Sequence, residues 1–183
     1  MLYPRIIPCL LLKNNALYKT VEFKNEKYIG DPINAVRIFN EKKVDELIIL
    51  DIDASREKKP PNFNLIQKIS NECQMPLNYG GGISKIDDIH KIISLGVEKV
   101  SVGNALINDP NLITKASKIF GKQSIVVVLD IKKRKFFNNF EVFIKNGTKG
   151  TGMNPLELAK KAEVLGAGEL VINSIDLDGT LKG

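Results

Sequence analysis

Hydrophobic residues form six short runs along the chain, and longer polar or amphipathic stretches separate them. Most of these runs are apolar on both faces, which is typical of parallel strands buried between helices and a core. We therefore expect six strands, at residues 5–12, 45–53, 75–83, 97–102, 123–133 and 169–176.

Apolar residues at helical spacing predict five helices between these runs. Asp31-Pro32, Asp109-Pro110 and Asn154-Pro155 each place a capping side chain before a proline at the first helical position. The expected helices cover residues 32–42, 63–73, 85–95, 110–121 and 155–165, and small hairpins are expected within 16–23 and 136–148. Strand and helix thus alternate five times before a sixth strand, as in a parallel α/β protein.

The chain also resembles itself. Residues 6–13 match residues 125–132 without gaps, and residues 45–53 match residues 168–178 with a small length difference. An offset of four strand–helix units favours a (βα)8 barrel of two equivalent halves over an open sheet, although chance similarity between apolar strands is the alternative. In this pairing Leu11 corresponds to Asp130, and strand alternation would direct both side chains into the barrel mouth.

Composition narrows the class of protein. The chain has 183 residues, 43% of them hydrophobic and 26% charged, as in a soluble globular protein. No apolar run reaches the ~20 residues that cross a bilayer, and the start is unlike a signal peptide, so we expect a cytoplasmic protein without membrane contact. The two cysteines and the single histidine, His90, show no metal-ligand spacing, so we expect no metal.

The net charge of +6 suits an anionic small molecule or nucleic acid. Residues 132–135 form the main basic cluster, and no nucleic-acid-binding motif accompanies it. We therefore expect an anionic small-molecule substrate, phosphorylated or a nucleotide sugar, and no nucleic-acid partner.

Asp130 is the first candidate for chemistry, because it ends a buried strand at the edge where parallel sheets place their active sites. The alternative is a carboxylate that only caps the following loop. Residues 80–82, three glycines, and Gly103-Asn104 could cradle a phosphate with backbone N–H groups. The alternative for the glycines is a tight turn. Asp178-Gly179 follows the sixth strand and could begin an equivalent site.

Several motifs together resemble the cyclase (synthase) subunit family of imidazole glycerol phosphate synthase. The motifs lie at residues 5–7, 30–32, 45–47, 50–52, 80–83, 98–101, 130, 166–169 and 174–180. The resemblance implies a TIM barrel of the histidine-biosynthesis type, a glutaminase partner at the N-terminal face of the barrel, and ammonia as a substrate without a cofactor.

The resemblance also implies roles for single residues. Asp130 matches one of the family's two catalytic aspartates, and Leu11 stands where the other would be. A leucine cannot transfer a proton, and loss of such a group costs ~10²–10⁴-fold in rate. The residues implied to bind substrate or phosphate are Lys19, Asp51, Gly81, Gly82, Gly103, Asn104, Asn173, Asp178 and Gly179. A ring of charges implied to gate ammonia at the barrel floor consists of Arg5, Glu46, Lys99 and Glu169.

The implied charge ring for ammonia is complete, whereas Leu11 replaces one of the two implied catalytic aspartates. This combination leads to our preferred functional hypothesis. Residues 8–13 and 30–35 resemble the branch of the family that amidates surface-polysaccharide sugars, converting an acetamido to an acetamidino group. One alternative is cyclase activity in histidine biosynthesis. A further alternative is a non-catalytic barrel that docks on a glutaminase.

A barrel of this type needs eight strands and typically ~250 residues. Only six strands are predicted here, so we interpret residues 1–183 as a single domain, an incomplete barrel that lacks the last two strand–helix units. The alternative is a natural short form that completes its barrel with another chain.

Overall fold

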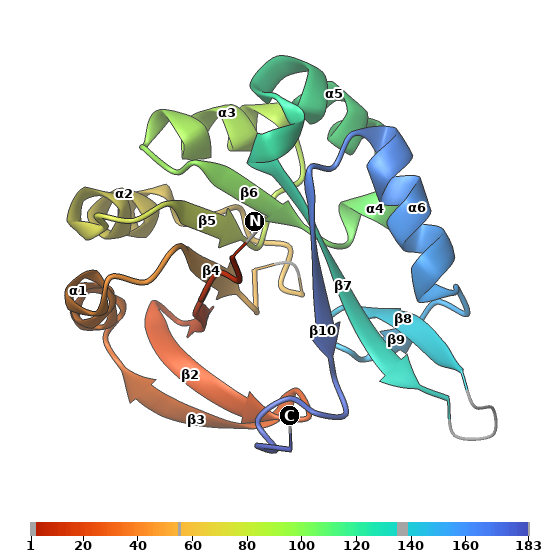
Figure 1. Ribbon diagram of the computed structural model, residues 1–183, viewed down its shortest axis with the longest axis horizontal. Helices are drawn as coiled ribbons and strands as arrows, with labels where there is room; N and C mark the ends of the chain where they lie inside the picture. Colours follow the sequence, from red (N-terminus) through yellow and green to blue (C-terminus); the bar gives the residue numbers. More distant parts are fainter. Residues whose placement is uncertain (1–2, 55, 135–138, 183) are drawn as a thin grey trace. The chain divides into compact units, whose positions relative to one another are not determined.

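The computed structural model describes residues 3–54, 56–134 and 139–182 and has an α/β fold (Figure 1). The chain forms two compact units. Met1–Lys19 and Tyr28–Val100 make up the first, and Thr20–Lys27 and Ser101–Gly183 make up the second. Each unit has its own strands, helices and buried core.

Parallel strands form the centre of the first unit. β4 (Leu47–Asp51) lies between β1 (Cys9–Lys13) and β5 (Leu77–Gly80), and both neighbours run parallel to it. β2 (Ala16–Val21) returns antiparallel along β1 and is followed by β3 (Lys24–Gly30). β6 (Lys99–Val102) lies where the chain passes from the first unit to the second.

The three helices of the first unit begin at or within one residue of the positions expected from the sequence. α1 (Pro32–Lys42) begins at Asp31, whose carboxylate accepts hydrogen bonds from two backbone N–H groups at 2.9 and 3.0 Å. α2 (Phe63–Glu72) packs beside α1, and α3 (Ile86–Ser94) follows β5 (Figure 1). The side chains that these helices bury are apolar, and they join those of β4 in one core: Val36, Leu47, Ile49, Ile66, Ile69, Ile89 and Ile92.

The second unit is built around β7 (Ile125–Lys133). β10 (Glu169–Ser174) pairs parallel with residues 126–131 of β7. β8 (Phe140–Ile144) pairs antiparallel with residues 130–133 of β7 and with the short β9 (Lys149–Gly150). The helical elements of this unit are α4 (Ala105–Asn108), α5 (Pro110–Phe120), the 3₁₀ turn η1 (Lys122–Ser124) and α6 (Pro155–Leu165).

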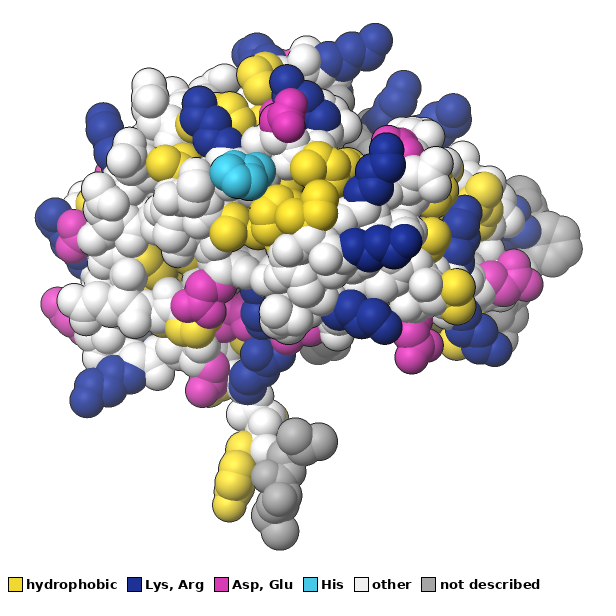
Figure 2. Space-filling view, turned by 90° about the horizontal axis from the view of Figure 1, so that it is seen from above, with side chains coloured by type: hydrophobic (Ala, Val, Ile, Leu, Met, Phe, Trp, Pro, Cys, Tyr) yellow, Lys and Arg dark blue, Asp and Glu magenta, His cyan; other side chains and the backbone are white. Residues whose placement is uncertain are grey.

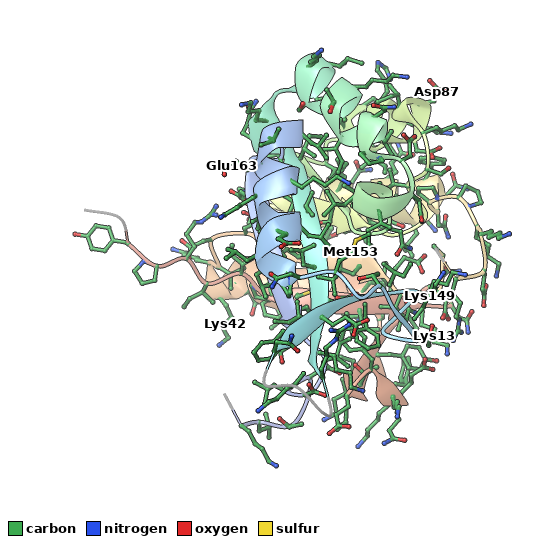
Figure 3. All side chains as sticks on the ribbon, turned by 90° about the vertical axis from the view of Figure 1, so that its right-hand side faces the viewer. Lys13, Lys42, Asp87, Lys149, Met153 and Glu163 are labelled. Atoms are coloured by element: carbon green, nitrogen blue, oxygen red, sulfur yellow. The ribbon has the colours of Figure 1, made fainter. Side chains whose placement is uncertain are left out.

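α5 and α6 pack against β7 and against each other. Figure 3 shows α6, marked by Glu163, lying along β7, with Met153 in the segment that leads into the helix. Asn154 caps α6 as expected, since its side chain accepts a 2.8 Å hydrogen bond from the backbone N–H of Leu156. On β10 the side chains of Leu170 and Ile172 remain 42% and 53% exposed.

The expected alternation of strands and helices is confirmed, with differences in three places. The hairpin expected within residues 16–23 is longer in the structure, because β2 and the turn after it lead into β3, and β2 also pairs antiparallel with β1. The segment 136–148, where a second hairpin is expected, contributes β8, which pairs with β7. The expected centre of that hairpin begins at Asn138, which lies outside the described residues. α4 was not expected. The single-domain interpretation stays a prediction.

No helix among the described residues is long and apolar enough to cross a bilayer. Figure 2 shows one face of the molecule, on which Lys and Arg side chains are spread among acidic and neutral ones. On this face the positive charge is therefore distributed and does not gather in a single patch.

Candidate active site

Asp130 and Asn173 form the centre of the candidate site in the second unit. The two residues are direct partners in the parallel pairing of β7 with β10. The Asn173 side chain donates a hydrogen bond from Nδ2 to Oδ1 of Asp130 at 3.3 Å. Leu129, the residue before Asp130, is buried, so strand alternation places the carboxylate on the opposite face of β7.

The surroundings change the acidity of Asp130. Burial, which disfavours the charged form, raises the pKa of this carboxyl to about 6. The Asn173 hydrogen bond opposes that rise, and the negative charge of Asp178 adds to it. A carboxyl with this pKa exchanges a proton readily near neutral pH, which is what general acid–base catalysis requires.

Asp178, in the turn after β10, holds the tip of the β2–β3 hairpin. Its carboxylate accepts hydrogen bonds from the Thr20 hydroxyl at 2.6 Å and from the Phe23 backbone N–H at 2.9 Å. Its backbone carbonyl accepts another from the Glu22 N–H at 2.9 Å. At Gly179 a Cβ atom would overlap the carbonyl oxygen of Thr20, so a glycine is needed for this close approach.

The end of β7 is tied to the same turn. The backbone N–H of Lys133 donates to the Asp176 carboxylate at 2.8 Å, and the Lys132 ammonium lies 4.0 Å from it. Asp176 was not among the expected site residues, although it belongs to the motif 174–180. Its acceptor role anchors the β10 turn to the strand that carries Asp130.

Asp51 and Gly81 lie together in the first unit. The Asp51 carboxylate accepts hydrogen bonds from the backbone N–H groups of Asp53 at 3.2 Å and Ala54 at 3.0 Å, and so orders the loop after β4. Burial raises the pKa of Asp51, and these two bonds oppose the rise. A Cβ atom at Gly81 would overlap the carbonyl oxygen of Asp51, and Gly81 has a φ of +115°.

The next glycine packs against the loop after β4. A Cβ atom at Gly82 would come within 2.6 Å of the Lys59 carbonyl oxygen, so this position also requires glycine for packing. The start of the following helix, α3, is capped by one of its own acidic side chains. The carboxylate of Asp88 accepts from the backbone N–H groups of Ser84 at 3.0 Å and Lys85 at 3.2 Å. Ser84 followed by acidic residues is a sequence signal for this helix cap.

The remaining expected binding residues lie at the end of β6 and on β2. Gly103 passes close to the β7 backbone, because a Cβ atom there would lie 3.2 Å from the Val128 carbonyl oxygen. The carbonyl of Asn104 accepts from the N–H groups of Ile107 and Asn108 in the short α4. Lys19 is exposed on β2, one residue before Thr20.

Three members of the expected charge ring meet in the first unit. Oε2 of Glu46, which is 1% exposed, lies 3.1 Å from the Arg5 guanidinium and 2.7 Å from the Lys99 ammonium. Glu46 and Lys99 lie at the N-terminal starts of β4 and β6, with Arg5 in the segment before β1. Glu169, the fourth member, opens β10 in the second unit.

Leu11 occupies the middle of β1 as expected. It is partly buried between Leu10 and Leu12, which are buried on the other face of the strand. Its hydrocarbon side chain supplies no proton-transferring group at this position. Among the described residues no group of three or more His, Cys, Asp or Glu side chains is arranged to hold a metal ion.

The comparisons with known proteins agree on one family. The model of the family "Histidine biosynthesis protein" matches residues 5–183. "Putative imidazole glycerol phosphate synthase subunit HisF" of Leptospira interrogans is 52% identical over 183 residues, which are 100% of this chain and 72% of the relative. "Putative imidazole glycerol phosphate synthase subunit hisF2" of Pseudomonas aeruginosa is 53% identical over 100% of this chain and 72% of the relative. "Imidazole glycerol phosphate synthase subunit HisF" of Lactococcus lactis subsp. cremoris is 44% identical over 100% of this chain and 71% of the relative.

A parallel-rich α/β fold with a partly buried carboxyl in the C-terminal half of a central strand is typical of the barrel enzymes. Within that class the chain belongs to the histidine biosynthesis family, whose fold is the TIM barrel, and it is a subunit of the imidazole glycerol phosphate synthase type. The family and the fold class expected from the sequence are thus confirmed. The names of the relatives favour the cyclase alternative over the preferred sugar-amidation hypothesis.

Proposed function

We propose that the chain is the ammonia-using synthase subunit of a glutamine amidotransferase complex, with cyclase chemistry of the imidazole glycerol phosphate synthase type. Asp130 is the acid–base group. The observation that carries this assignment is its place in the C-terminal half of β7, partly buried, with a pKa raised by burial to about 6. Such a carboxyl can accept a proton from an attacking nitrogen and return one to a leaving group.

The substrate is an anionic small molecule, for which the candidate binding residues of the second unit lie around Gly103 and Asp178. The excess of positive charge, +6 over the chain, supports an anionic ligand. Ammonia enters from a glutaminase partner at the N-terminal ends of the strands, and the complex works in the cytoplasm. The contact of Glu46 with Arg5 and Lys99 supports a charged gate there.

A second candidate function is amidation of a surface-polysaccharide sugar, from acetamido to acetamidino. The observation that favours it is Leu11, which leaves the site with one acid–base aspartate where the histidine-pathway cyclase has two. The names of the relatives support the first candidate. The position of Leu11 supports the second.

Two assays in parallel separate the candidates. In the first, the chain receives the bis-phosphorylated ribulosyl substrate of the cyclase with ammonium salts; in the second, it receives an acetamido nucleotide sugar with the same salts and the sugar-activating partner. Turnover of the ribulosyl substrate that is lost in Asp130→Asn supports the first candidate, and amidine formation alone supports the second. Stimulation of a glutaminase without turnover in either assay would overturn both in favour of a docking role.

A further inference from the structure

The Asp130 carboxyl receives its described hydrogen bond from a side chain on the neighbouring strand. Asn173 is the register partner of Asp130, and its Nδ2 lies 3.3 Å from Oδ1 of the carboxyl. Both residues are partly buried and lie in the middle or end of regular strands. A contact between paired strands is more rigidly placed than one from a loop.

The position of Asn173 on β10 is unusual for a strand of this kind. The three residues before it, Leu170, Val171 and Ile172, are all apolar, so the amide stands at the end of a hydrophobic run. A partly buried amide is stable there when it finds a hydrogen-bond partner, and Asp130 is that partner. The pairing therefore accounts for a polar residue that strand propensity alone would not favour.

The described neighbours of Asp130 along β7 and on β8 are apolar. Across the antiparallel pairing its partner on β8 is Phe143, and along β7 it lies between Leu129 and Ile131. Lys132, the nearest cation along the strand, lies beside Asp176. Among the described groups, Asp178 is the charge that acts on Asp130, and its effect favours the protonated carboxyl.

We propose that Asn173 is a positioning residue for Asp130: its amide fixes Oδ1 of the carboxyl and leaves Oδ2 as the oxygen that exchanges protons with the substrate. This inference rests on the proposed function of Asp130. The side-chain amide suits the task because it carries both a donor and an acceptor. It can donate to the ionised carboxyl and, after rotation, accept from the protonated one.

The hydrogen bond also has a calculable effect on acidity. An N–H that donates to the ionised carboxyl stabilises the charged form and so lowers the titration midpoint. Removing the Asn173 donor should therefore raise the titration midpoint of Asp130, now about 6, by about one pH unit. If Asn173 only fills space beside the carboxyl and donates no hydrogen bond to it, the titration midpoint of Asp130 will not change.

The test is a ¹³C NMR titration of the Asp130 carboxyl in the wild-type chain and in two variants whose new side chains are isosteric with each other. Asn173→Val lacks a donor, and Asn173→Thr retains a hydroxyl that can serve as donor and acceptor. We expect a midpoint about one pH unit higher in Asn173→Val and a smaller rise in Asn173→Thr. An unchanged midpoint in Asn173→Val would overturn the proposal. If that variant does not fold, Asn173→Leu, which has nearly the size of the amide, takes its place with the same expected result.

Because this readout needs no turnover, it separates the inference from the proposed function. Full activity of Asp130→Asn would overturn the proposed function and leave the titration result intact. If Asp130→Asn is inactive but Asn173→Val titrates like the wild type, only the positioning role fails. Where turnover is measurable, Asn173→Val should lower kcat with KM nearly unchanged, and the inflection of kcat with pH should move with the NMR midpoint.

Discussion

The hydroxyl of Thr20 donates a 2.6 Å hydrogen bond to the carboxylate of Asp178, although 158 residues separate the two in sequence. The same carboxylate accepts the Phe23 N–H, and the Asp178 carbonyl accepts the Glu22 N–H. Glu22 and Phe23 both have positive φ angles, of 52° and 59°, which are unfavourable for residues other than glycine. Asp178 therefore stabilises a hairpin turn whose own residues do not favour it.

We expect Asp178→Ala to loosen this turn. Loss of a charge-assisted hydrogen bond costs ~1.5–3 kcal/mol, so the hydrogen-exchange protection of the Phe23 amide should fall at least ~tenfold. The control is Asp176→Ala, which removes the acceptor of Lys133 from the same turn and should leave Phe23 protection unchanged. Equal protection in the wild type and Asp178→Ala would contradict this account.

Asp130 should make the stability of the chain depend on pH in a defined direction. Its pKa is about 6 in the folded chain and 3.8 in its ordinary state, so between these values the folded chain keeps a proton that the unfolded chain has lost. The free energy of unfolding therefore decreases as pH rises through this window, by about 3 kcal/mol in total. Above pH 6, Asp130→Asn should be more stable than the wild type by a similar amount, because the amide does not titrate.

Urea unfolding of both proteins at pH 4 and pH 8 measures this difference. The two proteins should differ by more at pH 8 than at pH 4. An identical change with pH in the wild type and in Asp130→Asn would show that the buried carboxyl does not govern this window.

The buried carboxylate of Glu46 should matter more for stability than an exposed one. Glu46→Gln leaves Arg5 and Lys99 without their shared anion, and Lys99 is only 13% exposed, so we expect a loss of about 2 kcal/mol or more in the free energy of unfolding. Glu72→Gln removes a surface ion pair with Arg37 of similar length, 3.0 Å, and should cost less than about 1 kcal/mol. Urea unfolding measures both losses. Equal losses in the two variants would contradict the expectation that the buried carboxylate of Glu46 contributes more to stability than an exposed one.

Two glycines of the expected phosphate site should respond differently to alanine. In Gly81→Ala the new Cβ atom meets the Asp51 backbone at a φ of +115°, and we expect a loss of about 3 kcal/mol or more. In Gly103→Ala the nearest atom is 3.2 Å away, and the expected loss is about 1 kcal/mol or less. Thermal unfolding of the pair provides the measurement, and a smaller loss in Gly81→Ala than in Gly103→Ala would be the contrary result.

The strands and helices could be predicted because local signals determine them. The run Ile125–Asp130 is too apolar for a surface position, and Asp31 and Asn154 stand before prolines at helix starts. The contacts that shape the site are not local. Nothing near Thr20 in the sequence indicates its bond to Asp178, and nothing near Asn173 indicates that it donates to Asp130.

The triple glycine has a packing role that its composition does not reveal. Residues 80–82 suggest a phosphate cradle by composition, which stays a prediction, and in the structure Gly81 and Gly82 also let two backbone segments approach each other. The neighbouring helix start is occupied by Asp88, whose position three residues into the helix region was visible in the sequence as a capping pattern. Packing constraints of this kind depend on segments distant along the chain, so glycine composition alone cannot distinguish them from ligand binding.

The central claim is that Asp130 performs the acid–base chemistry of an ammonia-using synthase subunit. The most direct test compares kcat of the wild type and Asp130→Asn on whichever acceptor the wild type turns over with ammonium salts. We predict that the variant loses at least ~100-fold in kcat while remaining folded and no less stable. An Asp130→Asn protein that turns over at the wild-type rate would contradict the account.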